Sequence, residues 1–330
     1  MKTPTSVQPE VEALLERTKA IVAPGLATAL RRVTPELRET VEVQLAGGGK
    51  MVRAGLVLLS AAACGGDDAK AVDGAVAIEL VHNFSLVHDD IIDGDLERRH
   101  RPTVWAAHGV DRAIIAGDGL ATLAFQVLLD VPSEQRANAA SLLADATQAM
   151  IAGQAQDMAF ERRGSVTLAE CLEMVSGKTA ALVRCAACLG AVLSGASDPT
   201  ISALWEFGHH LGIAFQAVDD LLGIWGAPDA TGKPVGNDLR RRKKTIPVCI
   251  ATSHGVELPA SFTTSTEPID DGDVGTLMDV LESCGARSAT IDLSERHVRD
   301  ALAVLQRAPL ADGPRGQLRE LANFVVGRDR

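Results

Sequence analysis

Residues 75–95 read AVAIELVHNFSLVHDDIIDGD, and they hold the clearest fold signal in the chain. The apolar residues recur at intervals of three and four, which is typical of the buried face of an α-helix. Asp89 and Asp93 are four residues apart and therefore share one helix face, with Asp90 three residues before Asp93. Carboxylates at the end of an apolar helix repel one another. They are usually placed together because they bind a hard divalent cation such as Mg²⁺.

A second acidic cluster ends another apolar helical stretch, and it reads Gln216-Ala217-Val218-Asp219-Asp220. One acidic pair at a helix end is most often a solvated terminus. Two pairs that each emerge from an apolar helix face favour metal binding instead.

Basic residues stand beside both clusters, although the chain has 32 Lys and Arg against 43 Asp and Glu and a net charge of −11. Lys50 and Arg53 follow three glycines, Arg98 and Arg99 follow the first cluster, and residues 240–244 read RRRKK after the second. Lys and Arg bind phosphate through charge-assisted hydrogen bonds. Metal carboxylates beside phosphate-binding cations predict diphosphate chemistry.

The rest of the chain predicts an all-α fold. Helical spacing recurs almost throughout, aromatic residues make up only 3%, and no strand alternation is visible. No shift in composition marks a boundary, so we expect residues 1–330 to form a single domain. The polar segment from His254 to Gly275 is expected to be a surface loop.

Composition also bears on location and partners. The acidic balance argues against nucleic-acid binding, and no unbroken apolar run reaches the ~18 residues of a membrane span. Six cysteines lack the spacing of a disulfide framework, and the first ten residues lack an apolar signal core, so we expect a cytoplasmic protein. Cys185 and Cys188 are expected to be small buried helix residues and not a redox pair.

These residues resemble a known family, the trans-isoprenyl diphosphate synthases or polyprenyl synthetases. The resemblance runs from about Ala46 to the C-terminus, and its order and spacing are highly specific. The matching motifs are Gly48-Gly49-Lys50-x-x-Arg53, Asp89-Asp90-x-x-Asp93 with Arg98-Arg99-x-x-Pro102-Thr103, Gly117-Asp118, Gly153-Gln154-x-x-Asp157, Lys178-Thr179, Phe215-Gln216-x-x-Asp219-Asp220, Gly232-Lys233-Pro234-x-Gly236-x-Asp238-Leu239 and Lys243-Lys244-Thr245-x-Pro247.

The resemblance implies an isoprenoid synthase-type bundle of antiparallel helices around a central cavity, usually as a homodimer. It implies a Mg²⁺-dependent prenyltransferase that condenses isopentenyl diphosphate with an allylic diphosphate, which is dimethylallyl, geranyl or farnesyl diphosphate. The expected product is a short-chain trans-polyprenyl diphosphate.

The family's motifs also imply a role for each matching residue. Asp89, Asp93 and Asp219 would hold three Mg²⁺ ions on the allylic diphosphate, with Asp90 and Asp220 in support. Thr179 and Gln216 would lie near the developing cation. The basic and imidazole residues would bind the substrate diphosphates. The allylic diphosphate would be bound by Arg98, Lys178 and Lys233. Isopentenyl diphosphate would be bound by Lys50, Arg53, His82 and Arg99, and Lys243 is a further candidate for substrate binding.

Phe84 is expected to set product length, because that position acts as a floor in members of the family. One helical turn is about as long as one isoprene unit, roughly 5 Å. Of the candidate positions Ser85, Phe84, Val81 and Ala77, only Phe84 carries a bulky side chain. The alternative is that Phe84 is an ordinary core residue. A floor at Phe84 predicts geranylgeranyl diphosphate as the expected product, with farnesyl diphosphate as the second choice.

The second acidic motif departs from the family, because Gly223 stands where a third Asp is normal. A weaker third metal site is expected unless Asp238 contributes from nearby. Two other functions stay open at this point. A terpene cyclase would share the first chemical step, but its Asn, Ser and Glu motif is absent and aromatic residues are few. A non-catalytic partner subunit would usually lack the first aspartate motif, which is intact here.

Overall fold

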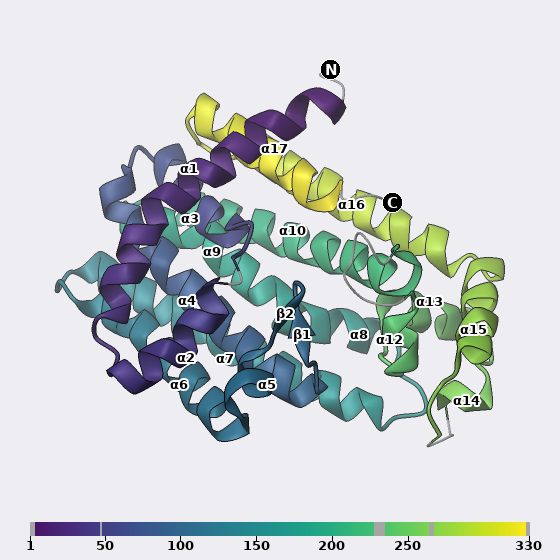
Figure 1. The fold of residues 1–330 in the computed structure, drawn as a ribbon. Helices are drawn as coiled ribbons and strands as arrows, with labels where there is room; N and C mark the ends of the chain where they lie inside the picture. Colours follow the sequence, from purple (N-terminus) through teal and green to yellow (C-terminus); the bar gives the residue numbers. More distant parts are fainter. Residues whose placement is uncertain (1–3, 47, 228–234, 264–266, 328–330) are drawn as a thin grey trace. The chain divides into compact units, whose positions relative to one another are not determined.

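The computed structural model describes residues 4–46, 48–227, 235–263 and 267–327, and these are almost entirely helical (Figure 1). The all-α prediction is therefore confirmed. The elements in chain order are α1 (Pro4–Leu30), α2 (Pro35–Ala46), α3 (Val52–Ala63), α4 (Asp68–Asp93), β1 (Glu97–Arg98), β2 (Arg101–Pro102), α5 (Val104–His108), α6 (Val110–Leu129), α7 (Glu134–Glu161), α8 (Leu168–Val175), the π-helical turn η1 (Ser176–Ala180), α9 (Ala181–Leu193), α10 (Asp198–Trp225), α12 (Asn237–Arg240), α13 (Ile246–Ser253), α14 (Ala260–Thr263), α15 (Asp271–Ser283), α16 (Ala286–Arg307) and α17 (Asp312–Val326).

The chain divides into two compact units. The first unit comprises Met1–Thr147, Arg184–Trp205 and Leu305–Leu321, and the second comprises Gln148–Val183, Glu206–Val304 and Ala322–Arg330. The expectation of a single domain stays a prediction.

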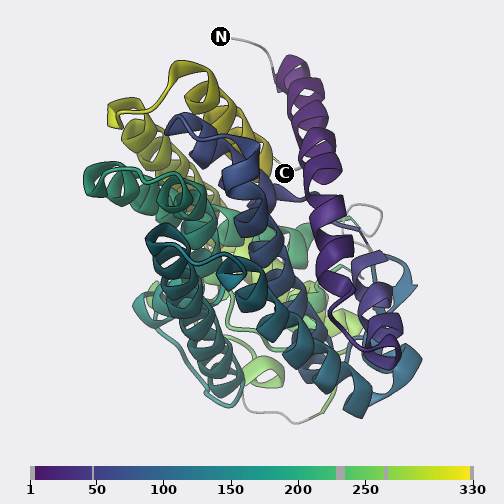
Figure 2. The same ribbon diagram turned by 90° about the vertical axis from the view of Figure 1, so that its left-hand side faces the viewer.

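Helix α4 is the central element of the first unit, because it packs against α1, α3 and α6 (Figures 1 and 2). Its start is capped by Asp67, whose carboxylate accepts the Lys70 backbone N–H at 3.0 Å, and its end by Gly94 in the left-handed conformation. Close approach to α9 depends on Gly74, where an added Cβ would lie 2.6 Å from a Leu193 methyl carbon.

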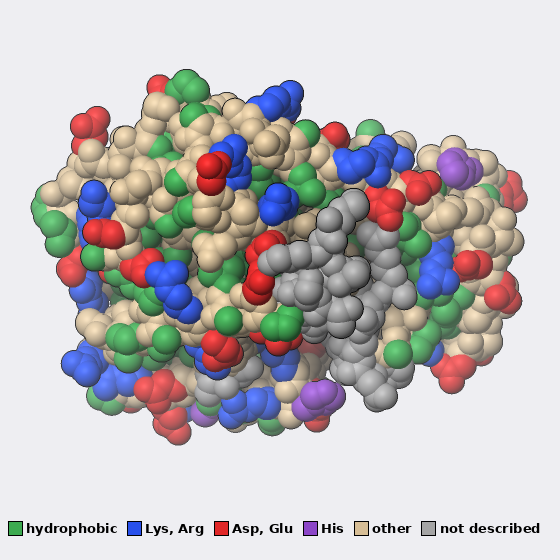
Figure 3. All heavy atoms as spheres, turned by 90° about the horizontal axis from the view of Figure 1, so that it is seen from above, with side chains coloured by type: hydrophobic (Ala, Val, Ile, Leu, Met, Phe, Trp, Pro, Cys, Tyr) green, Lys and Arg blue, Asp and Glu red, His purple; other side chains and the backbone are tan. Residues whose placement is uncertain are grey.

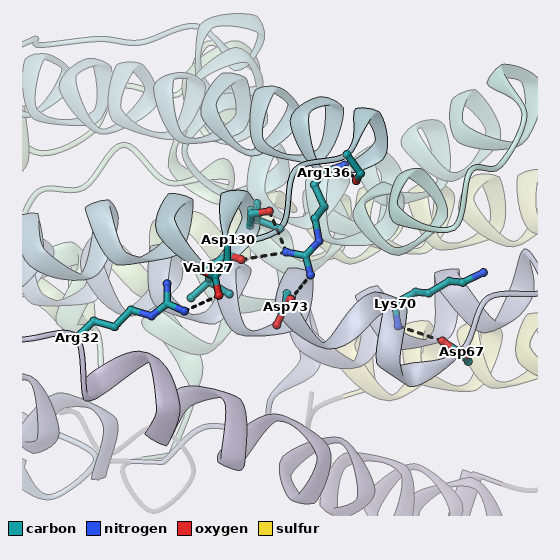
Figure 4. A network of polar contacts seen from close by, with 9 residues as sticks. Arg32, Asp67, Lys70, Asp73, Val127, Asp130 and Arg136 are labelled. Carbon is teal, nitrogen blue, oxygen red and sulfur yellow. Dashed lines mark hydrogen bonds and ion pairs between the residues drawn. The ribbon is translucent and has the colours of Figure 1, made fainter.

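Arg136 fixes the far end of α6 against α4 (Figure 4). Its guanidinium donates to the carbonyl oxygens of Val127 and Leu128 at 3.2 and 3.0 Å, and it forms an ion pair with Asp73 of α4. The last carbonyl groups of a helix otherwise lack partners, so this contact both caps α6 and sets its position along α4.

The core of the second unit lies among α7, α8, α10 and α12 to α16, and its buried side chains include Phe160, Phe262 and Leu239. Helix α8 begins with a capping box. Thr167 accepts from the Glu170 backbone N–H at 3.2 Å, and the Glu170 carboxylate accepts from the Thr167 N–H at 2.9 Å.

Two sequence predictions need correction. The chain does contain strands, because β1 and β2 form an antiparallel hairpin, but two residues per strand are too few to show alternation. The segment from residue 254 to 275 is not all loop, since α14 lies within it and α15 begins at Asp271. The absence of an unbroken apolar run of ~18 residues is not overturned. By length and composition alone, α6 and Leu168–Leu193 could cross a membrane, although their windows contain charged residues and are 44% and 72% buried. The second is buried as a core helix of a soluble protein is.

The prediction for the two neighbouring cysteines is confirmed. Cys185 and Cys188 are free thiols buried in α9, and burial raises the pKa of Cys188 to about 12, which leaves it an unreactive thiol. On the face drawn in Figure 3, acidic and basic side chains of the described residues are interspersed.

Candidate functional site

The last turn of α4 presents its aspartates in two directions. Asp89 and Asp93 are half-buried on one side, whereas Asp90 is only 1% exposed. Asp90 Oδ1 accepts a hydrogen bond from Arg98 Nε at 2.9 Å and forms an ion pair with Nη2 at 2.7 Å. Burial alone would lower the pKa of Arg98, but the bond and charge of Asp90 hold that pKa above its ordinary value. Asp90 therefore ties the β1–β2 hairpin to the end of α4.

Arg53 lies beside His82 in the same unit, with Arg53 Nη1 3.3 Å from His82 Nε2. Burial, and then the charges of Arg53, Arg99 and Arg98, hold the pKa of His82 well below its usual value, so the imidazole is neutral at physiological pH. Gly49 lies beside the Arg99 guanidinium, since an added Cβ would be 3.5 Å from Nη1. This arrangement of cations beside a glycine run suits an anion.

Backbone strain coincides with these residues. Four non-glycine residues of the described chain have positive φ, namely Met51, Arg99, His100 and Arg242. Arg99 and His100 are the two central residues of the hairpin turn, a position that usually carries Asn or Gly. Met51 and Arg242 adjoin Lys50 and Lys243. Each strained residue is therefore a diphosphate-binding candidate or its neighbour, as expected where strain is kept for function.

The second unit holds a chain of hydrogen bonds from η1 to α13. Thr179 Oγ1 donates to Gln216 Oε1 at 2.5 Å, and Gln216 Nε2 donates to Asp220 Oδ1 at 2.7 Å. Asp220 Oδ2 accepts the Ile246 N–H at 2.8 Å, which satisfies the start of α13. Burial raises the pKa of Asp220 to about 7, against the lowering effect of these bonds. Asp220 thus points inward, and neighbouring Asp219 is exposed.

Lys178 is positioned by the π-helical turn η1 and by an ion pair with the carboxylate of Asp157 on α7. Gly153 permits this approach, because an added Cβ would lie 2.2 Å from the Lys178 backbone nitrogen. The motif Gly153-Gln154-x-x-Asp157 therefore has a structural meaning: its glycine admits η1, and its aspartate holds Lys178. π-Helical turns are frequent at functional sites.

Asp238 takes the place of a side chain at position 223. A Cβ added to Gly223 would lie 2.0 Å from Asp238 Oδ2, so the two positions compete for the same space. The Asp238 charge also acts to raise the pKa of Asp220, which places a carboxylate close to the second acidic motif.

The structure brings some of the predicted residues into contact with one another. It joins Arg53 with His82, Asp90 with Arg98, and Thr179 with Gln216. Lys50 is exposed, Lys243 is half-buried, and Lys233 lies outside the described residues. No three His, Cys, Asp or Glu side chains within the described ranges gather as a ready metal cage. The donor chemistry nevertheless fits a hard cation, because carboxylates at Asp89 and Asp93 share one accessible face.

Sequence reasoning gave no role to Glu79 or Asp157. Glu79 is 4% exposed on α4, where its carboxylate accepts the Ala54 N–H at 3.1 Å and joins α3 to α4. Burial raises its pKa, and the charges of Arg53 and Arg99 oppose that rise. A lone acid inside the apolar run AVAIELV was the available signal.

Known relatives agree in sequence and in fold. The pattern of the polyprenyl synthetase family matches residues 34–267. In Mycobacterium tuberculosis, a (2E,6E)-farnesyl diphosphate synthase is 40% identical over 97% of this chain and 96% of its own length. A geranylgeranyl diphosphate synthase of the same organism is 40% identical over 90% of this chain and 89% of its own.

Two solved structures extend this agreement. A polyprenyl synthetase from Streptomyces coelicolor has 41% identity and a TM-score of 0.88, over 96% of this chain and 99% of that one. A polyprenyl synthase from Caulobacter crescentus, solved with calcium and isoprenyl diphosphate, has 28% identity and a TM-score of 0.87, over 97% and 98% of the two chains. The chain belongs to the polyprenyl synthetase family. It is an isoprenyl diphosphate synthase, a transferase of isoprenoid biosynthesis.

Proposed function

We propose that this chain condenses isopentenyl diphosphate with an allylic diphosphate and releases a short-chain trans product. Geranylgeranyl diphosphate is our first choice for that product, and farnesyl diphosphate is our second. The observation that carries the proposal is the end of α4, where Asp89 and Asp93 share a face beside a hairpin of arginines. The relatives' activities support the short-chain class. A cyclase finds no support among these relatives.

Divalent cations complete the proposed site. Asp89, Asp93 and Asp219 are the proposed ligands of three Mg²⁺ ions, and the calcium in the Caulobacter relative supports divalent binding. When bound, such ions neutralise the leaving diphosphate, so that the allylic C–O bond can ionise. Asp90 and Asp220 support the ligands from within, the first through Arg98 and the second through Gln216 and Ile246.

The chain's own cations are proposed to hold the two diphosphates apart. Arg98, Lys178 and Lys233 bind that of the allylic substrate. Lys50, Arg53 and Arg99, with the neutral His82, bind that of isopentenyl diphosphate. Lys243 is a further candidate for binding a substrate diphosphate. Because His82 is neutral, its protonated ring nitrogen can donate to a phosphate oxygen without adding to the repulsion among the arginines.

Thr179 and Gln216 are proposed to face the allylic cation. The Gln216 amide donates to Asp220 and accepts from Thr179, so its orientation is fixed and its carbonyl dipole does not have to reorganise. Water must be excluded from this step, because it would capture the cation. The proton lost after carbon–carbon bond formation passes to the released diphosphate.

We propose a homodimer in the cytoplasm, with residues 1–330 as one domain. Helix α6 supports the dimer, since Val110, Ile114 and Ile115 are 42%, 43% and 57% exposed on a largely apolar helix. Large exposed apolar faces mark interaction surfaces.

The direct test is incubation with labelled isopentenyl diphosphate and each primer in turn, followed by chromatography of the dephosphorylated products. The proposal expects labelled geranylgeraniol from all three primers, with some labelled farnesol from dimethylallyl and geranyl diphosphate. Hydrocarbon products without isopentenyl incorporation would show a cyclase, and no product with any primer would show a non-catalytic subunit.

A further inference from the structure

His88 lies between two features of the site and has no role in the chemistry described above. It follows Phe84 by one helical turn on α4, so the two side chains share a face. Their ring centroids are 5.0 Å apart at an interplanar angle of 76°, an edge-to-face contact. Phe84 itself is 9% exposed.

The other side of the His88 ring rests on α6. Its Nε2 is 3.1 Å from the carbonyl oxygen of Ile114, and since a carbonyl only accepts, Nε2 carries the proton. A Cβ added to buried Gly117 would lie 2.2 Å from Nε2 and 2.4 Å from Cδ2. The imidazole therefore occupies the space that any side chain at position 117 would need.

The helix pair around this contact cannot slide easily. At the opposite end of α6, Arg136 caps the carbonyl groups of Val127 and Leu128 and pairs with Asp73 of α4 (Figure 4). Contacts at Arg136 and at His88 thus set the position of α6 along α4. The ring of Phe84 packs against the second of these residues, His88.

We propose that His88, seated in the notch left by Gly117, is the positioning residue that fixes Phe84 as the floor for the growing chain. This inference rests on the proposed function. Displacing the imidazole frees the Phe84 ring to turn aside, and Val81 and Ala77, nearer the start of α4, have smaller side chains than Phe84. One turn of about 5.4 Å accommodates about one further isoprene unit.

Gly117→Ala is the test that adds one methyl group and nothing else. Since a real Cβ contact is rarely shorter than 3.4 Å, the imidazole must retreat by about 1.2 Å from the 2.2 Å overlap. We expect the main product to lengthen by at least one isoprene unit. Gly119→Ala is the matched control on the same helix, because its Cβ meets only the flexible end of Leu37 at 3.0 Å. It should leave the product unchanged.

His88→Ala removes the ring without any overlap and should lengthen the product in the same way, even if Gly117→Ala fails to fold. Phe84→Ala is the reference for a removed floor. Longer products from Phe84→Ala together with wild-type products from both Gly117→Ala and His88→Ala would overturn the inference and leave the proposed synthase intact. A wild-type product from Phe84→Ala would overturn it too, since Phe84 would then be no floor. Absence of condensation by the wild type would instead refute the proposed function.

Discussion

Replacing Gly223 tests how the second acidic motif works without its third aspartate. Any side chain at 223 displaces Asp238, because Oδ2 lies 2.0 Å from the added Cβ and would have to retreat by about 1.4 Å to reach an ordinary contact. Losing an outer partner of a metal site typically costs about tenfold to a hundredfold in metal affinity. We therefore expect Gly223→Ala to raise the Mg²⁺ concentration at half-maximal rate about tenfold. Gly223→Asp should raise it as well, although it restores the residue usual in the family.

The assay is initial rate against Mg²⁺ concentration at saturating substrates, with Mg²⁺ binding in the presence of inorganic diphosphate followed by calorimetry. Asp238→Asn should give a similar rise, because it removes the displaced carboxylate directly. Gly275→Ala is the control, since nothing lies within 4 Å of its added Cβ. A lower Mg²⁺ requirement in Gly223→Asp would refute the reasoning, because it would show that the site lacks a carboxylate at 223.

Further predictions concern the aspartates of α4 and a histidine of α16. Asp89→Asn should lower kcat/KM roughly a thousandfold, about 4 kcal/mol, with an unchanged melting temperature. Asp90→Asn should also lower the free energy of unfolding by about 2 kcal/mol, because Arg98 loses its buried partner. Burial, then His210 and His209, lower the pKa of His297 to about 4, so wild-type stability should fall as the pH drops from about 6.5 towards 4. Melting curves of His297→Gln should show a shallower fall than those of the exposed control His254→Gln.

The helices and the first acidic motif were accessible from sequence because both rest on local periodicity. Spacing alone places Asp89 and Asp93 on one face, and the capping box at Thr167 and Glu170 marks the start of α8. These signals need only a few neighbouring residues and no knowledge of long-range contacts.

The remaining features depend on contacts between distant segments. No local pattern shows that Gly153 admits the backbone of Lys178, that Asp238 fills the space at Gly223, or that His88 does so at Gly117. The hairpin that carries Arg98 and Arg99 was not predicted, because strands of two residues show no alternation of apolar and polar side chains. The inward direction of Asp90 and Asp220 likewise follows from partners elsewhere in the chain.

The central claim is that carboxylates at the end of α4 act with Mg²⁺ to condense two diphosphates. It is tested most directly by incubating the wild type and Asp89→Asn with labelled isopentenyl diphosphate and farnesyl diphosphate, with Mg²⁺ or with EDTA, and identifying the product by mass. We expect geranylgeranyl diphosphate from the wild type with Mg²⁺ only, and at most a trace from the variant. Full turnover in EDTA, or a near-normal rate for Asp89→Asn, would contradict it.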